Sequence, residues 1–332
     1  MTKNTVICKR NLSVDLIKIF AMFGVMSLHT NMGRLDTYPT AFILSRIAGI
    51  SIPLFFMVSG YLMLDRETNF RYSISKIIRI IRFVFIIVFI HWMLIRWFVD
   101  YPFLSMLKTF MGSFLQRGKF FVFWYFGAMC ILYSILPILQ KIHKNKKVRY
   151  ILLGILGAIS FILFELDAEM SFEKMYVPQT FRIWYWLFFF MVGGIMKEWK
   201  SSENIFPSHK FLLFNILLSA TAFLFFVYWF RYKINSIEYF FGSFLCWMYS
   251  FAVFAYFITK NFKGKWVSVL SQLFLPCYAI HMMVIHTIRK FIDSSIFGLW
   301  SPLIDYILVV SLTLSISLLI MKTPIVHNIF KI

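Results

Sequence analysis

The sequence has few charged residues, and acidic residues are the scarcest of them. Only 14% of its 332 residues are charged, and 14 Asp and Glu side chains stand against 34 Lys and Arg side chains. Soluble domains carry about 25% charged residues, so this composition excludes a soluble globular enzyme and a disordered protein. Hydrophobic residues make up 60% of the chain, which predicts an integral membrane protein.

Cysteine is also scarce. The four cysteines, Cys8, Cys130, Cys246 and Cys277, form no CxxC pair and no other zinc-ligand spacing, so we expect neither a disulfide framework nor a metal site. The chain also lacks a Gly-rich phosphate loop and the GxGxxG, GxSxG and HExxH motifs. Any chemistry must therefore depend on residues in apolar helices and short loops.

Ten apolar segments bounded by charge, Pro or Gly account for most of the chain. At about 20 residues per membrane helix, they leave only short connections. We therefore expect an all-α polytopic membrane protein, with a single domain over residues 1–332 and no separate soluble domain. The predicted spans are 12–32, 41–64, 79–99, 122–140, 150–165, 181–197, 211–230, 239–259, 268–288 and 302–321.

The positions of Lys and Arg predict the orientation. With a cytoplasmic N-terminus, about twice as many of them fall on the cytoplasmic side as on the outer side. An even number of spans then places both termini in the cytoplasm. The net charge of +20 thus reflects membrane topology and contact with membrane lipid. It does not indicate that the protein binds nucleic acid. The densest run, 141–149, is interpreted as a topology anchor, with an anionic cofactor as the alternative.

The first predicted helix carries ionisable residues, which are costly in hydrocarbon. Lys18 and His29 are eleven residues apart, so they share one face and lie about 16 Å apart along the axis. Asp15 precedes Lys18 by three residues and can pair with it. Lys18 either snorkels to the membrane surface or belongs to a site. His29 is either a hydrogen-bonded structural histidine or an acid–base or acyl-accepting group.

The third helix begins with Lys76, Arg79 and Arg82 at every third position. We expect these three residues to share much of one face at the cytoplasmic end. They either anchor the helix by the positive-inside rule or clamp phosphate oxygens, which suit guanidinium forks.

The ninth helix contains Tyr278 and His281, one turn apart on one face. Pro276 comes just before them and can loosen the helix there. The two residues form either a structural pair or the lining of a cavity near a reaction centre. Aromatic clusters at 123–125 and 184–186 are interpreted as an interfacial belt, with a platform for sugar rings as the alternative.

These motifs, in this order and with ten spans, resemble the bacterial membrane acyltransferase-3 family over essentially the whole chain. In that family a basic residue, usually Arg, precedes a critical His by eleven positions, and here Lys18 takes the place of the Arg. The other matching positions are His29, the segment from Pro53 to Ser59, Gly60 and Tyr61, the pair Arg79 and Arg82, the pair Trp124 and Tyr125, and the pair Tyr278 and His281.

The resemblance implies a membrane-bound O-acetyltransferase in the bacterial cytoplasmic membrane. It would transfer an acetyl group from cytoplasmic acetyl-CoA to a hydroxyl of an extracytoplasmic or lipid-linked polysaccharide, such as capsule or exopolysaccharide. His29 would act as base or acyl carrier together with Lys18, and Arg79 and Arg82 would bind the cofactor. Further candidate site residues are Asp15, Ser59, Tyr61, Trp124, Tyr278 and His281.

Two alternatives from other classes stay open. A transporter or flippase without acyl chemistry would also carry charges inside the membrane. An amino-acid uptake module is the other alternative, because some relatives of the family are fused to racemase domains, although no racemase segment is present in this sequence.

Overall fold

The structure is a computed structural model that describes residues 11–170, 177–202, 206–230, 240–260, 262 and 264–323. These residues form helices and no strand, which confirms the predicted all-α class. Both termini, at 1–10 and 324–332, lie outside the described residues, so their predicted cytoplasmic location stays a prediction.

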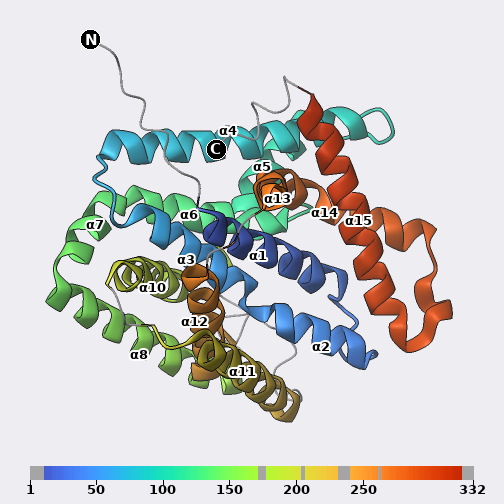
Figure 1. Cartoon of the computed structure of the whole chain (residues 1–332). Coiled ribbons are helices and arrows are strands. Elements are labelled where there is room, and N and C mark those ends of the chain that lie inside the picture. The colour runs from blue at the N-terminus through green and yellow to red at the C-terminus, as the bar shows by residue number, and fades with distance from the viewer. Residues whose placement is uncertain are drawn as a thin grey trace.

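Fourteen α-helices and four short 3-10 turns follow one another along the described chain, and the α-helices are labelled as in Figure 1. In chain order they are α1 (Leu12–Thr30), α2 (Pro39–Ile47), η1 (Ala48–Ile50), α3 (Ser51–Met63), α4 (Phe70–Ile95), α5 (Phe103–Phe114), η2 (Phe121–Phe123), α6 (Trp124–Ser134), α7 (Leu136–Lys144), α8 (Lys146–Met170), η3 (Gln179–Phe181), α10 (Ile183–Ser201), α11 (His209–Phe230), α12 (Phe244–Thr259), α13 (Lys265–Gln272), α14 (Phe274–Phe291), η5 (Ser294–Trp300) and α15 (Ser301–Lys322).

Helices α1 and α3 form the centre of the bundle (Figure 1). Helices α4 and α5 lie along one side of this centre, and α8 with α10–α12 lie along the other. The pair α14 and α15 packs against α1 at a third side. The main apolar core runs through α1, α3, α6 and α10, so the two helices with the predicted Lys–His and Ser-Gly-Tyr motifs lie next to each other at the centre.

Six helical segments are long and apolar enough to cross a membrane, and two bent helix pairs raise the number to eight among the described residues. The two remaining predicted spans coincide with α10 and with the shorter apolar helix α12. The count of ten spans stays a prediction. Residues 103–114, which the sequence places between spans, form the additional helix α5.

Both bent pairs break just before a proline. Helices α6 and α7 meet at 62° before Pro137, and α13 and α14 meet at 56° before Pro276. Proline lacks a backbone N–H and its ring clashes with the preceding turn, so a break at this place is expected. The second break confirms the expectation that Pro276 loosens the ninth span.

The closest helix contact in the centre joins α3 to α10 through two glycines. A Cβ atom added at Gly60 would lie 1.8 Å from the carbonyl oxygen of Phe190, and one added at Gly193 would lie 1.9 Å from that of Met57. Small residues allow backbones to approach in this way in membrane helices. The Gly in the Ser-Gly-Tyr motif therefore serves the contact with α10.

The predicted interfacial belt of aromatic residues is wrong for most of its members. Phe123, Trp124, Tyr125, Tyr185 and Trp186 are all buried. The Trp186 ring stacks on Phe56 at 4.8 Å and lies 5.1 Å from the ring of Trp124. These side chains fill the space between α3, α6 and α10, because large rings bury more apolar area in the core than at a membrane surface.

Replacing Gly60 or Gly193 with Ala is expected to destabilise the bundle, because the new methyl group meets backbone atoms that cannot move without separating α3 from α10. Overpacking of this kind costs about 1–3 kcal/mol. The loss is measured as a lower melting temperature in detergent and less protein in the membrane. Gly154→Ala is the matched control, because nothing lies within 4 Å of its added Cβ. Equal melting temperatures for all three variants would contradict the prediction.

Candidate active site

Lys18 and His29 lie on α1 and mark the two ends of the candidate site. The expected contact between Asp15 and Lys18 is present, since the Lys18 Nζ atom lies 3.8 Å from Oδ1 of the buried Asp15. A buried carboxylate needs such a partner. The side chain of Asn11 accepts hydrogen bonds from the backbone of Ser13 and Val14, so α1 begins just before this pair.

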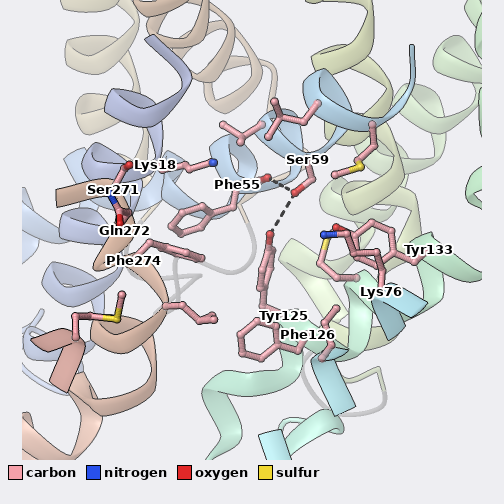
Figure 2. Close-up of a pocket in the computed structure, with 17 residues that line it drawn as sticks. Lys18, Phe55, Ser59, Lys76, Tyr125, Phe126, Tyr133, Ser271, Gln272 and Phe274 are labelled. Atoms are coloured by element: carbon pink, nitrogen blue, oxygen red, sulfur yellow. Dashed lines mark hydrogen bonds between the residues drawn. The ribbon is translucent and has the colours of Figure 1, made fainter. Parts of the chain in front are cut away.

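A cavity of about 370 Å³ opens beside Lys18 (Figure 2). Its walls come from α1, α3, α4, α6, α15 and the break between α13 and α14. Most of the lining is apolar, and its charged members among the described residues are Lys18 and Lys76. Figure 2 shows these two side chains entering from opposite sides. An apolar cavity with a few converging polar groups is the usual form of a binding site for a small molecule.

The candidate residue Ser59 lies in the middle of this cavity. Its hydroxyl donates to the carbonyl oxygen of Phe55 at 2.9 Å and lies 3.4 Å from the hydroxyl of Tyr125 on α6. The two hydroxyls lie between Lys18 and Lys76 (Figure 2). They provide a hydrogen-bonding pair within an apolar wall, which is suited to orienting a long and mostly apolar ligand.

Arg79 and Arg82 do not share a face with Lys76, and this corrects the expectation of one cationic face. The two arginines are exposed and line a separate shallow groove with Arg71 and Ser75. Six positions along a helix correspond to a rotation of about 240°, so Lys76 and Arg82 must diverge. Lys76 points into the cavity, although it remains close enough to Arg79 to experience its charge.

His29 and His281 meet across the contact between α1 and α14. Their ring centroids lie 5.3 Å apart, and the ring of Phe121 lies 5.7 Å from that of His29. Nδ1 of His281 faces the carbonyl oxygens of Tyr278 at 2.9 Å and Cys277 at 3.2 Å. Because carbonyl oxygens only accept hydrogen bonds, Nδ1 is the ring nitrogen that carries a proton, and in the neutral imidazole Nε2 then has a free lone pair.

The Nε2 atom of His281 is buried and has no hydrogen-bond partner among the described residues. A buried acceptor without a partner is costly, so this atom is available to a neighbouring donor or to a ligand. The structure therefore places two predicted site residues from distant parts of the sequence side by side, with a lone pair available between α1 and α14.

A layer of aromatic rings connects the cavity to the histidine pair. Tyr125, which lines the cavity, lies 6.1 Å from the ring of Tyr278, and that ring lies 5.7 Å from His281. The hydroxyl of Tyr278 donates to the carbonyl oxygen of Val122. The expected pair of Tyr278 and His281 is thus present, and Tyr278 is its link to the cavity.

Tyr61 and Trp124 lie outside the cavity lining, although they belong to the motifs. The Tyr61 ring packs 5.9 Å from Phe254, with Lys197 Nζ 6.0 Å above it. Trp124 packs against Trp186. Both rings hold helices together beside the site, so the structure gives them a packing role.

Sequence reasoning missed the residues at the break between α13 and α14. Ser271 and Gln272 line the cavity there, next to Phe274 of the following turn. Pro276 was the available signal, because it predicted an interrupted helix. In membrane proteins, backbone that is not helical usually lines a cavity. Within the described residues, no three His, Cys, Asp or Glu side chains are grouped so that they could hold a metal ion.

Comparison with known proteins agrees with the resemblance seen in the motifs. The model of the acyltransferase-3 family, described as an acyltransferase domain, matches residues 11–322. No curated protein and no solved structure matches the chain significantly. The matched region includes α1 with Lys18 and His29, the whole cavity and α14 with His281. The chain therefore belongs to the acyltransferase-3 family of multi-pass membrane acyltransferases.

Proposed function

We propose that this protein transfers an acetyl group from cytoplasmic acetyl-CoA to a hydroxyl of a cell-surface polysaccharide, either outside the membrane or linked to a lipid. The observation that carries the proposal is the order of three features across the bundle. A cavity with two lysines lies at one end, an aromatic layer follows, and the pair of His29 and His281 lies behind it.

The cavity suits the donor in shape and charge. The pantetheine arm of acetyl-CoA is long and thin, and its amides would bind the hydroxyls of Ser59 and Tyr125 in the apolar wall. Its phosphates would lie near Lys18 and Lys76, which enter the cavity from opposite sides and are close enough to interact electrostatically. Arg66 and Arg79 add positive charge nearby, and Arg79 with Arg82 would extend the phosphate site onto the exposed groove.

The histidine pair suits the chemistry of an acyl transfer. Acetyl-CoA would supply the acetyl group as an activated thioester. His29 would take the proton from the acceptor hydroxyl as its oxygen bonds to the carbonyl carbon, and the proton would pass to the departing thiolate. His281 would orient His29 through its free Nε2 lone pair. This geometry supports a base more directly than an acyl carrier, because the second histidine has the orienting role found in base-activated sites.

The proposal extends to the location and orientation of the protein. We place the protein in the cytoplasmic membrane of a bacterium, with Lys18 toward the cytoplasm and His29 toward the outer side. The acceptor would reach His29 from outside, and capsule or exopolysaccharide units are the proposed acceptors. Ester formation requires only one free hydroxyl near His29.

Substitution of His29 with Ala is expected to abolish acetylation, because the base is lost, while the protein still inserts in the membrane. The measurement is acetate released by mild alkali from the surface polysaccharide of cells that carry each variant. His286→Ala is the control, since His286 is an exposed residue of α14 and should retain acetylation. Acetylation at the wild-type level in His29→Ala cells would contradict the assignment. Unchanged acetate with altered polysaccharide export after deletion would favour the transporter.

Lys76→Ala is expected to raise the KM for acetyl-CoA about tenfold or more with a smaller change in kcat, because one charged hydrogen bond to phosphate contributes about 1.5–3 kcal/mol. Arg79→Ala should also weaken the use of acetyl-CoA. Lys144→Ala is the matched control, since Lys144 is an exposed lysine paired with Glu67. If Arg79→Ala raised the KM for acetyl-CoA and Lys76→Ala did not, the phosphates would bind in the exposed groove and the role of Lys76 would be contradicted.

Ser59→Cys, in a chain whose four native cysteines are replaced, is expected to react with a membrane-impermeant maleimide in inside-out vesicles. Coenzyme A should slow this reaction, because both occupy the same cavity. Met57→Cys is the control that should stay unlabelled, since Met57 is fully buried on the same helix. Labelling of Ser59→Cys only in right-side-out vesicles would reverse the proposed orientation.

A further inference from the structure

The outer end of α1, directly after His29, is held by an arginine of another helix. Nη2 of Arg289 donates to the carbonyl oxygens of Thr30 at 2.8 Å and Met32 at 3.1 Å. Thr30 is the last residue of α1 and the neighbour of His29. Arg289 belongs to α14, the same helix that carries His281. The same helix therefore both provides the second histidine and binds the end of the helix that provides the first.

The backbone groups that Arg289 binds have few other partners. The last carbonyl groups of an α-helix have no N–H from the next turn to bind them. Side chains add to the hydrogen bonds near this end, since Thr30 Oγ1 donates to the carbonyl oxygen of Met26, and Asn31 donates to that of Ser27 through both its backbone N–H and Nδ2. The carbonyls of Thr30 and Met32 are bound from α14 by Arg289. The guanidinium thus binds the last carbonyl of α1 and one carbonyl of the turn that follows.

A second contact fixes the loop that follows. Arg34 pairs with the buried Asp305 of α15, whose carboxylate also accepts a hydrogen bond from Ser294 at 2.8 Å. Ser294 in turn lies 2.8 Å from the hydroxyl of Ser301. Arg289 interacts electrostatically with both Arg34 and Asp305. The carboxylate therefore balances two arginines, and the helix end is joined to α14 and α15 at successive points.

We infer that Arg289 is a positioning residue that sets the distance between His29 and His281, through its hydrogen bonds to the carbonyls of Thr30 and Met32. The inference rests on the proposed acyl transfer. Two imidazoles on different helices, 5.3 Å apart, keep a productive geometry only if the helices cannot slide past each other. A displacement of about 1 Å at a reaction centre can reduce the rate about a hundredfold. Arg289 acts on the backbone beside His29 and touches no reacting group.

The test compares two substitutions that both keep the aliphatic stem. Arg289→Met removes every donor, whereas Arg289→Lys retains an ammonium that can donate to both carbonyls. We expect Arg289→Met to lower kcat tenfold or more, with the KM for acetyl-CoA and the Kd for coenzyme A within twofold of the wild type. Arg289→Lys should recover most of the loss. Lys290→Ala, at the exposed neighbouring position, should behave as the wild type.

Hydrogen exchange in the purified protein gives a second readout that does not depend on activity. Arg289→Met should speed amide exchange in peptides that cover residues 26–34, and neither Arg289→Lys nor Lys290→Ala should do so. The inference would be overturned if Arg289→Met had the same kcat as Lys290→Ala. It would also be overturned if Arg289→Met raised the KM for acetyl-CoA by the same factor by which it lowered kcat. Slow exchange at 26–34 in Arg289→Met would overturn it as well. A wild-type protein without acetylation would instead disprove the proposed function, and hydrogen exchange would still decide the role of Arg289 at the helix end.

Discussion

The site depends on the close approach of α3 and α10, which Gly60 and Gly193 make possible. A helix turns by about 100° at each residue, so three consecutive residues of α3 face three directions. Ser59 lines the cavity, Gly60 contacts α10, and Tyr61 packs beside Phe254. Because α10 lies directly against the Gly60 side of α3, the rotation of α3 about its axis is fixed, and Ser59 faces the cavity. The part of the cavity wall that α3 forms follows from this contact.

Much of the architecture could be predicted from sequence because membrane helices satisfy their own backbone and stand out by composition. The helical class, the break before Pro276 and the pairing of Asp15 with Lys18 depend on local spacing, and each is present. Local spacing could not show which helix faces pack against each other in the folded bundle. Lys76 and Arg82 were expected together and diverge, and the aromatic residues expected at the membrane surface fill the core.

The meeting of His29 with His281 illustrates the same limit. The two residues are separated by most of the chain, and only the packing of α1 on α14 brings their rings together. Motif order suggested that both belong to one site, but their contact and the free lone pair of His281 required side-chain geometry. Ser271 and Gln272 were missed because a break in a helix has no side-chain signature of its own beyond the proline that causes it.

The aromatic layer between the cavity and the histidine pair also has a consequence for proton leakage across the membrane. The hydroxyl of Tyr278 donates to the carbonyl oxygen of Val122, that of Tyr125 lies 3.4 Å from that of Ser59, and the two rings pack 6.1 Å apart. A water-filled path from a cationic cavity to two imidazoles would conduct protons along the electrochemical gradient. Packed rings interrupt such a path, so under the proposed function the cavity would hold a donor without opening a proton leak across the membrane.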